Sequence, residues 1–540
     1  MTMVLGARSL IAAVCGFTLL STVGCGSGVA PGSGGTESVP IGPKKLIIGQ
    51  GPGAEPTDGG VAFGGGGGNQ YMQFIVNAGL TVYDERATVQ PRIAERVPSI
   101  ENGDWQTFPD GRMDVTWKLR TDVRWQDGTP LTADDLLLAF KGQMDPELVA
   151  RGTAVLEQIV EMSAPDPRTL VMRWKHIYVF ANEMGISTLV PLPSHLLGPI
   201  FDRGDKPAFT SSSYLNDDWV GLGPYRMKEW VRGSFMNLTA YEDYFLGKPK
   251  IDQLTIQFVG DTNTLVVRML SGDVDMVPVG PFKLGEAATL KDQFVSQGRG
   301  ELVLSSVRLR VGRWQLRDTS FPWVPNPSVR QALVKLIDRQ RMLDELYGGM
   351  GAIQDILLDP KDPAYRRTLE KGLIDLSYDV TEAHRLLAEA GLARGSEGAY
   401  RTQSGAPFAI ELAAQTDIAT NVREVQIVQD FWRGAGLQVE LVLIPGTVRW
   451  QEVGAQLKGV YIGGANPGYS AYNSLITSQI SGPPRWTGGN MGGYSNPGAD
   501  QLYARITAEL DTSQRSELTA QIVSSPSTTW RTCRSEPTTT

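Results

Sequence analysis

Residues 113–140 read MDVTWKLRTDVRWQDGTPLTADDLLLAF, and this stretch passes from a strand through a turn into a helix. The alternation of apolar and polar side chains in VTWKLR is typical of a half-buried strand. Asp127-Gly-Thr-Pro130 has the residue types of a tight turn. Thr132 can cap the helix that follows, and Asp134 and Asp135 lie in its first turn, where the helix dipole favours negative charge. We therefore expect these carboxylates to cap a helix rather than to catalyse a reaction.

Strands and helices continue along the rest of the chain without an internal repeat. Asn326-Pro327 begins a helix that Gly348-Gly349 ends, and a second helix is expected from Thr381 to Ala390. FAIELAA and LQVELVLI read as strands on either side of the helix VREVQIVQDFWRGAG, and such a β-α-β unit favours a parallel sheet. A chain of 540 residues is too long for one compact core, so we expect an α/β or mixed α+β fold in more than one lobe.

Composition argues against several classes of function. The formal net charge of -8 disfavours a nucleic-acid-binding protein, because phosphate binding needs a basic surface. The cysteines are Cys15, Cys25 and Cys533, so neither a disulfide nor a thiolate metal site can form between residues 26 and 532. The three histidines lack metal-binding spacing, and the chain contains neither a Walker sequence nor a G-x-S-x-G motif. We therefore expect no metal, no cofactor and no catalytic residue.

The N-terminus has the pattern of a secretory signal. A short apolar run from Leu10 to Leu20 is followed by small residues that end in Gly24-Cys25. Thr22 to Cys25 resembles a bacterial lipobox, although Leu is usual at the first position. The expectation is a signal peptide at 1–24 and an acylated Cys25, with an unlipidated signal peptide as the alternative. Residues 25–43 are rich in Gly, Ser and Pro and are expected to form a flexible tether.

The segment quoted above resembles the signature of the extracellular solute-binding protein family 5, which includes the dipeptide, oligopeptide and nickel receptors of ABC importers. Further segments resemble the same family and, in order, cover almost the whole mature chain. They are Gly221 to Tyr225 (GLGPY), Tyr241 to Asp261, Ser271 to Asp275 (SGDVD), the helix with Arg330 and Ile337-Asp-Arg339, and Leu386 to Gly391 (LLAEAG). Each segment is a weak signal alone, but their shared order and spacing indicate this family.

The resemblance implies a periplasmic-binding-protein fold, in which two lobes close over a ligand in the cleft between them. Lobe one would comprise 44–82, 190–282 and 490–540 and carry an extra domain at 83–189, and lobe two would comprise 283–489. The implied function is a receptor that delivers a peptide-like or other polar solute to an ABC permease and ATPase complex. Such a protein is exported and lipid-anchored at the periplasmic or extracellular face of the cytoplasmic membrane, and we expect a monomer.

The resemblance also indicates where a ligand would lie. In oligopeptide receptors of the family, an aspartate near the end of lobe two pairs with the amino group of the peptide, but Asn466 lies in that stretch here. A neutral amide cannot supply the charge, which disfavours peptides with a free amino group. Trp314, Trp323, Tyr469 and Trp486 are candidate cleft aromatics, because flat rings suit both peptide backbones and sugar faces. Packing in the core is the alternative for each of them.

Two other classes of function stay open at this point. A secreted glycan hydrolase would require two carboxylates that meet in the cleft, and acidic residues are plentiful. A membrane-tethered sensor on the same fold is the other alternative, because a fold does not fix a function.

The C-terminal tail differs in character from the rest of the chain. After a helix expected from Asp511 to Ile522, the sequence SSPSTTWRTCRSEPTTT shows no apolar periodicity. Read one base earlier, the codons of Thr528 to Ser535 can encode Asp-Asp-Leu-Ala-Asp-Leu-Pro-Leu, which resembles the ending of the family. We therefore interpret the tail after about Val523 as the product of a frameshift, with a natural divergent tail as the alternative.

The lipid anchor can be tested directly. Cys25→Ala removes the acceptor thiol, so the variant is expected in the soluble fraction of a bacterial host, whereas the wild type is expected in the membrane fraction and labelled by a fatty-acid probe. A wild type that is fully soluble and unlabelled would contradict the anchor.

Overall fold

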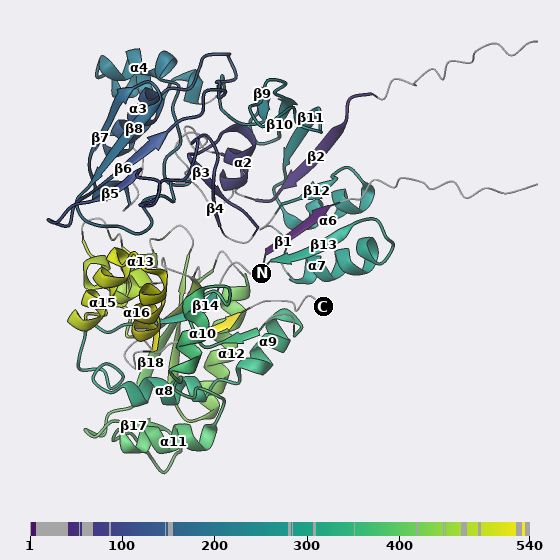
Figure 1. Cartoon of the computed structure of the whole chain (residues 1–540). Helices are drawn as coiled ribbons and strands as arrows, with labels where there is room; N and C mark the ends of the chain where they lie inside the picture. Colours follow the sequence, from purple (N-terminus) through teal and green to yellow (C-terminus); the bar gives the residue numbers. More distant parts are fainter. Residues whose placement is uncertain are drawn as a thin grey trace, which may run out of the picture.

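The computed structural model shows two lobes, one above the other, and each lobe has its own large mixed sheet (Figure 1). This confirms the expected α/β fold in more than one lobe. The structure describes residues 2–6, 42–524 and 532–534. Within these ranges it leaves out residues 53, 57–68, 86–87, 146, 149–154, 216, 279–281, 283, 306–308, 350–351, 417–418, 446–447, 449, 466–471, 484–485 and 487.

The first sheet has the strand order β13-β1-β12-β2-β11-β10-β9. Its strands are β1 (Thr2–Gly6), β2 (Lys45–Gln50), β9 (Tyr225–Val231), β10 (Phe235–Ala240), β11 (Gln253–Phe258), β12 (Met276–Val277) and β13 (Glu301–Ser305). β2 is parallel to both β11 and β12, and the other neighbouring pairs are antiparallel. The helices α6 (Thr262–Ser271) and α7 (Leu284–Leu290) pack against this sheet in one apolar cluster.

The extra domain is a four-stranded antiparallel sheet of order β5-β6-β8-β7, packed against α3. Its elements are β5 (Trp105–Thr107), β6 (Met113–Lys118), α3 (Ala133–Met144), β7 (Ile159–Asp166) and β8 (Thr169–Trp174). Shorter elements surround it: α2 (Asn69–Val76), β3 (Thr81–Tyr83), β4 (Val89–Pro91), α4 (Ser194–Asp202) and α5 (Lys206–Thr210). One apolar core joins the extra domain to the first sheet, from Trp117 to Ile256, so the two form one lobe.

Asp135 fastens the turn to the helix in this domain. Its buried carboxylate accepts hydrogen bonds from Trp125 Nε1 at 3.1 Å, from the Thr132 amide at 2.8 Å and from the Ser194 amide at 2.8 Å. Thr132 and Asp135 form a capping box, which satisfies amides that the first turn of a helix leaves unpaired. The capping role expected for the acidic pair is confirmed for Asp135.

The glycines of GLGPY allow the extra domain to approach the first sheet. A Cβ at Gly221 would lie 1.8 Å from the carbonyl oxygen of Val76, and one at Gly223 would lie 2.3 Å from the carbonyl carbon of the same residue. The amide of Gln126 donates to Gly221 O, and its side chain donates to Gly223 O at 3.0 Å. The motif is therefore a packing requirement between the two parts of the first lobe.

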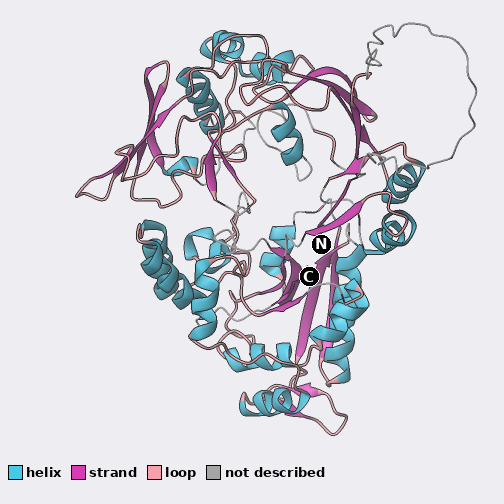
Figure 2. Ribbon diagram, turned by 45° about the vertical axis from the view of Figure 1, so that its right-hand side comes forward, coloured by secondary structure: helices cyan, strands magenta, loops and turns pink. Residues whose placement is uncertain are grey.

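The second sheet has the order β15-β21-β14-β20-β18-β19, with helices on either side of its long strands (Figure 2). Its strands are β14 (Leu309–Trp314), β15 (Ala352–Gln354), β18 (Ala409–Gln415), β19 (Gln438–Ile444), β20 (Gly459–Ala465) and β21 (Thr532–Arg534). The helices of this lobe include α8 (Pro327–Lys335), α9 (Arg339–Tyr347), α10 (Pro363–Glu370), α11 (Val380–Glu389), α12 (Ala419–Gly434) and α13 (Trp450–Gln456). β18 is parallel to β19 and β20, so the β-α-β unit through α12 is confirmed.

The structure differs from two sequence-based expectations in this lobe. The helix after Asn326 is not continuous to Gly348, because Asp338 caps a new helix, α9, by accepting from the Arg341 amide at 3.0 Å. The start of lobe two also lies later than residue 283, because α7 and β13 pack in the cluster on the first sheet.

The C-terminal helices lie with the second lobe rather than with lobe one, where residues 490–540 were expected. α15 (Pro497–Ala508) and α16 (Thr512–Ser524) share an apolar cluster with Ile356, Leu358 and Ala364. Lys371 forms an ion pair with Glu517 at 2.5 Å. Of the tail with the predicted frameshift, the structure describes after α16 only β21, which pairs with β14 and β15.

Asp135 and its neighbour Asp134 offer a matched test of the buried carboxylate. Asp135→Ala leaves three donors unpaired in a buried site, and we expect it to lower the free energy of unfolding by about 3 kcal/mol or more in urea titrations. Asp134→Ala removes an exposed charge of the same helix turn and is expected to cost about 0.5 kcal/mol. Equal losses for both variants would contradict the role assigned to Asp135.

Candidate functional site

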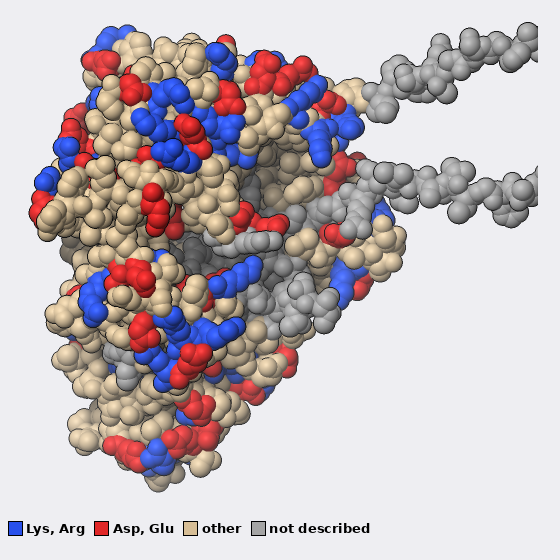
Figure 3. Space-filling model, viewed as in Figure 1, with Lys and Arg blue, Asp and Glu red and all other residues tan. Residues whose placement is uncertain are grey.

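A hollow opens between the two lobes on the face shown in Figure 3. The chain passes from one lobe to the other between Ser305, where β13 ends in the first sheet, and Leu309, where β14 begins in the second. On another side the lobes touch directly, because the Val179 amide donates to Thr507 O at 2.9 Å and Leu510 packs against the core of the first lobe. The cleft between the lobes is therefore bounded on one side by the covalent connection between Ser305 and Leu309, and on another side by the noncovalent contact at Val179 and Thr507.

Near that contact lies a half-buried carboxyl group, Glu183 of the extra domain. Tyr83 donates its hydroxyl hydrogen to Glu183 Oε2 at 2.5 Å. Burial raises the pKa of Glu183, while the hydrogen bond from Tyr83 and the charge of Arg515 oppose that rise. Arg515 belongs to α16, so its charge acts on Glu183 from the second lobe.

The parallel strands of the second lobe all end at one edge of its sheet. β18 ends at Gln415, β19 at Ile444 and β20 at Ala465, and the antiparallel β14 begins beside the end of β20, with Leu309 opposite Ala465. We call this the carboxyl edge. It borders the crossing between the lobes, and in open α/β sheets ligands bind beyond the carboxyl ends of the strands. The carboxyl edge is therefore the part of the second lobe in which to look for ligand-binding groups.

Arg310, at the start of β14, forms a buried ion pair at this edge. Arg310 Nε donates to Glu424 Oε2 at 3.0 Å, and Arg310 Nη2 donates to Asn421 Oδ1 at 2.7 Å. Burial alone would lower the pKa of Arg310, but the charge of Glu424 outweighs it and raises the pKa overall. Both partners come from the beginning of α12, so the pair locks this helix to β14.

Arg313 lies on the opposite face of β14, where it meets two aromatic rings. Its guanidinium carbon is 6.0 Å from the ring centre of Trp450 and 5.9 Å from that of Tyr461, and these rings stack with centres 5.0 Å apart. Arg313 Nη2 donates to Gly464 O at 2.9 Å, which directs the guanidinium toward the carboxyl edge. Tyr461 in turn donates its hydroxyl hydrogen to Gln415 Oε1 at 3.1 Å.

The structure places two of the predicted cleft aromatics in the core of the second lobe. Trp314 and Trp323 are buried, and their ring centres lie 6.2 Å apart. Trp314 follows the alternation of β14 onto the face that α8, α11 and α12 cover. Trp323 stacks on Phe321 and donates from Nε1 to Gln315 O at 2.9 Å, so its polar atom is satisfied inside the core. Core packing, the alternative for each ring, therefore applies to these two residues.

The other predicted site residues are less fully described. Asn466 and Tyr469, like the predicted lipidation site Cys25, lie outside the described residues. Trp486 is partly exposed and has a positive φ of 50°, a strained conformation for a bulky residue. It remains a candidate cleft aromatic, since strained residues cluster at ligand sites.

Sequence reasoning missed four residues near the carboxyl edge. Arg310 pairs with α12 on one face of β14, whereas Arg313, Trp450 and Tyr461 meet on the other face. The alternation in LRVGRW could have indicated that Arg310 and Arg313 lie on opposite faces of a strand. Nothing in the sequence indicated that Trp450 and Tyr461 stack, because that contact depends on how α13 packs on the sheet.

The described residues show no other centre of chemistry. No group of three or more His, Cys, Asp and Glu side chains that could hold a metal ion occurs among them. No helix in the described part of the chain is long and apolar enough to cross a membrane. His195 pairs with Asp127 at 2.6 Å in the DGTP turn, and this contact lowers the pKa of Asp127 against the effect of burial.

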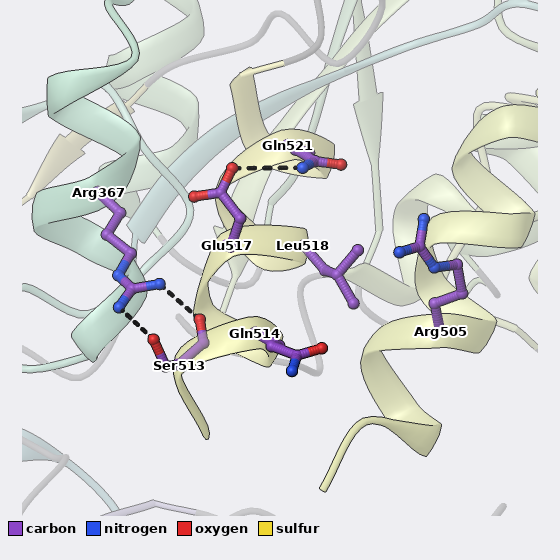
Figure 4. Close-up of a pocket in the computed structure, with 7 residues that line it drawn as sticks. All are labelled: Arg367, Arg505, Ser513, Gln514, Glu517, Leu518 and Gln521. Carbon is purple, nitrogen blue, oxygen red and sulfur yellow. Dashed lines mark hydrogen bonds between the residues drawn. The ribbon is translucent and has the colours of Figure 1, made fainter. Parts of the chain in front are cut away.

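A separate pocket of about 340 Å³ lies between α10, α15 and α16 (Figure 4). Arg367 crosses one side of it and donates from Nη2 to Ser513 Oγ at 2.8 Å, while Arg505 lies opposite. This pocket is open and is formed by elements of the second lobe alone, so it is not part of the cleft.

Comparisons with known sequences agree with this geometry. A family model described as "Bacterial extracellular solute-binding proteins, family 5 Middle" matches residues 88–482. Oligopeptide-binding protein AppA of Bacillus subtilis (strain 168) is 25% identical over 373 residues, which are 68% of this chain and 63% of AppA. Protein XP55 of Streptomyces lividans is 26% identical over 449 residues, 81% of this chain and 73% of XP55. The chain thus spans a little less than two thirds of the length of AppA.

Solved structures share the fold. That of AppA from Bacillus subtilis in complex with a nonapeptide has a TM-score of 0.68 and 20% identity, over 91% of this chain and 94% of that one. That of NikZ from Campylobacter jejuni in complex with Ni(L-His) has a TM-score of 0.69 and 20% identity, over 91% and 92% of the two chains. The two-lobed solute-binding fold is thereby confirmed, and this chain belongs to family 5 of the bacterial extracellular solute-binding proteins.

Proposed function

We propose that this protein is the receptor of an ABC importer: it captures a polar solute between its lobes and delivers it to a membrane permease and ATPase. The observation that carries the proposal is the carboxyl edge, where cationic and aromatic side chains gather beside the crossing between the lobes. Family membership over residues 88–482 supports the same function.

Binding without turnover fits the groups at this edge. A glycan hydrolase needs two carboxylates with room for a sugar between them. At the carboxyl edge, Glu424 is buried and bonded to Arg310, and Asn421 lies beside it as a neutral amide. A carboxylate whose oxygens already accept from a guanidinium is poorly placed to act as a base or nucleophile. These contacts favour a binding protein over the hydrolase.

The proposed ligand is a polar solute other than a peptide with a free amino group. AppA is named as an oligopeptide-binding protein, which makes peptide-like solutes the first class to consider. Asn466 stands in the stretch where an acidic residue would pair with the amino group, so blocked peptides, sugars and opines fit better. The proposal also places the protein outside the cytoplasmic membrane, attached through acylated Cys25 and the tether of residues 25–43.

Solute binding can be tested on the full chain. We expect a peptide, sugar or opine in a thermal-shift library to raise the melting temperature, because a ligand that binds only the native state stabilises it. The same ligand is expected to alter the radius of gyration in small-angle scattering as the lobes close. Mass spectrometry of the recovered ligand is expected to show it unchanged. Recovery of a cleaved product would contradict the receptor and favour the hydrolase.

A further inference from the structure

Arg313 differs from Arg310, Arg317 and Arg330 of the second lobe in how its charge is balanced. Arg310 has the carboxylate of Glu424. Arg317 donates to Ser481 O at 2.8 Å and also to Met491 O and Gln315 Oε1. Arg330 donates to the carbonyl oxygens of Trp323 and Val324. Arg313 donates to one carbonyl oxygen, that of Gly464, while its Nη1 is buried without a hydrogen-bond partner among the described residues.

Among the residues that the structure describes, no acidic side chain pairs with this guanidinium. The groups that contact the Arg313 guanidinium in the described part of the chain are the rings of Trp450 and Tyr461 and the Gly464 carbonyl. A second cation, Arg310, acts on it from the other face of β14. Burial, together with Arg310, lowers the pKa of Arg313 to about 10, and Tyr461 opposes this. At neutral pH the guanidinium is still charged. A buried cation without an anion is destabilising, so a bound anion would be strongly favoured here.

Resting on the proposed function, we infer that Arg313 binds a carboxylate group of the solute, with Nη1 as the donor and the stacked Trp450 and Tyr461 rings beside it. The guanidinium fork matches the planar geometry of a carboxylate and bonds it more strongly than a neutral group. The bond from Arg313 Nη2 to Gly464 O fixes the direction of the fork, which lowers the entropy lost on binding. The receptor therefore selects acidic solutes over their neutral counterparts.

Matched pairs of solutes test the charge preference. Each pair consists of an acid and its amide: N-acetyl-Ala-Ala with N-acetyl-Ala-Ala-amide, succinate with succinamide, and glutarate with glutaramide. We expect at least one acid to raise the melting temperature of the wild type while its amide does not. Arg313→Gln is expected to weaken binding of that acid roughly 30-fold or more in calorimetry, the loss that accompanies removal of one partner of a buried charge pair.

Arg317→Gln is the control, because it removes a nearby arginine of the same lobe that is exposed and whose guanidinium already donates to protein oxygens. Without ligand, Arg313→Gln is expected to keep or raise the melting temperature, whereas Arg317→Gln is expected to lower it. Amides that bind as tightly as the acids, or an Arg313→Gln variant that binds the acid like the wild type, would overturn the inference and leave the receptor function intact. If no acid of these pairs stabilised the wild type while a neutral sugar of the wider library did, the assignment of Arg313 would fail and the receptor function would stand. If nothing in either panel stabilised it, the receptor function would be contradicted as well.

Discussion

The direction of three parallel strands determines the arrangement of the second lobe. Because α12 crosses from β18 to β19 and returns the chain in the same direction, the two strands must end at the same edge, and β20 joins them there in parallel. β14 runs the other way, so its beginning meets their ends. That single constraint brings Arg310 to this edge and pairs Arg313 with Tyr461, whose hydroxyl reaches Gln415 at the end of β18. The polar groups of the cleft follow from strand direction rather than from any local motif.

Elements with strong local signals were predictable from the sequence. The turn and capped helix of residues 113–140 form as expected, because Asp135 satisfies amides within a few residues of itself. The helix after Asn326 shows the limit of such reasoning: its apolar spacing continues past Ile337, yet Asp338 starts a new helix. Apolar periodicity reports which face is buried, and a cap can interrupt the helix without changing that face.

The site itself was hardly predictable, since it depends on contacts between distant segments. Trp314 and Trp323 are aromatic and lie near the crossing in sequence, yet their side chains face the helices of the lobe and fill its core. Arg313, one residue from Trp314, points to the other face of the same strand. Neighbouring residues of a strand have opposite surroundings, so position along the chain cannot separate a core tryptophan from a ligand-facing arginine. The surroundings of Trp314 and Arg313 differ because α13 and Tyr461 of β20 pack on the Arg313 face of β14.

The N-terminal strand of the first sheet conflicts with the predicted signal peptide. β1 lies between β12 and β13 and pairs with both, but Thr2–Gly6 falls within the predicted signal peptide. Cleavage before Cys25 would remove β1 and leave the facing backbone groups of β12 and β13 without a partner strand, an open edge that proteins usually avoid. If the signal peptide is cleaved, the first sheet can therefore stay intact only if another segment of the chain occupies the position of β1 between β12 and β13. The ending obtained by reading the tail one base earlier contains Leu-Ala-Asp-Leu-Pro-Leu. Its Ala and two Leu residues alternate along one face, but its Pro supplies no backbone donor and limits the pairing with two neighbours. The tail as translated pairs β21 with the second sheet instead.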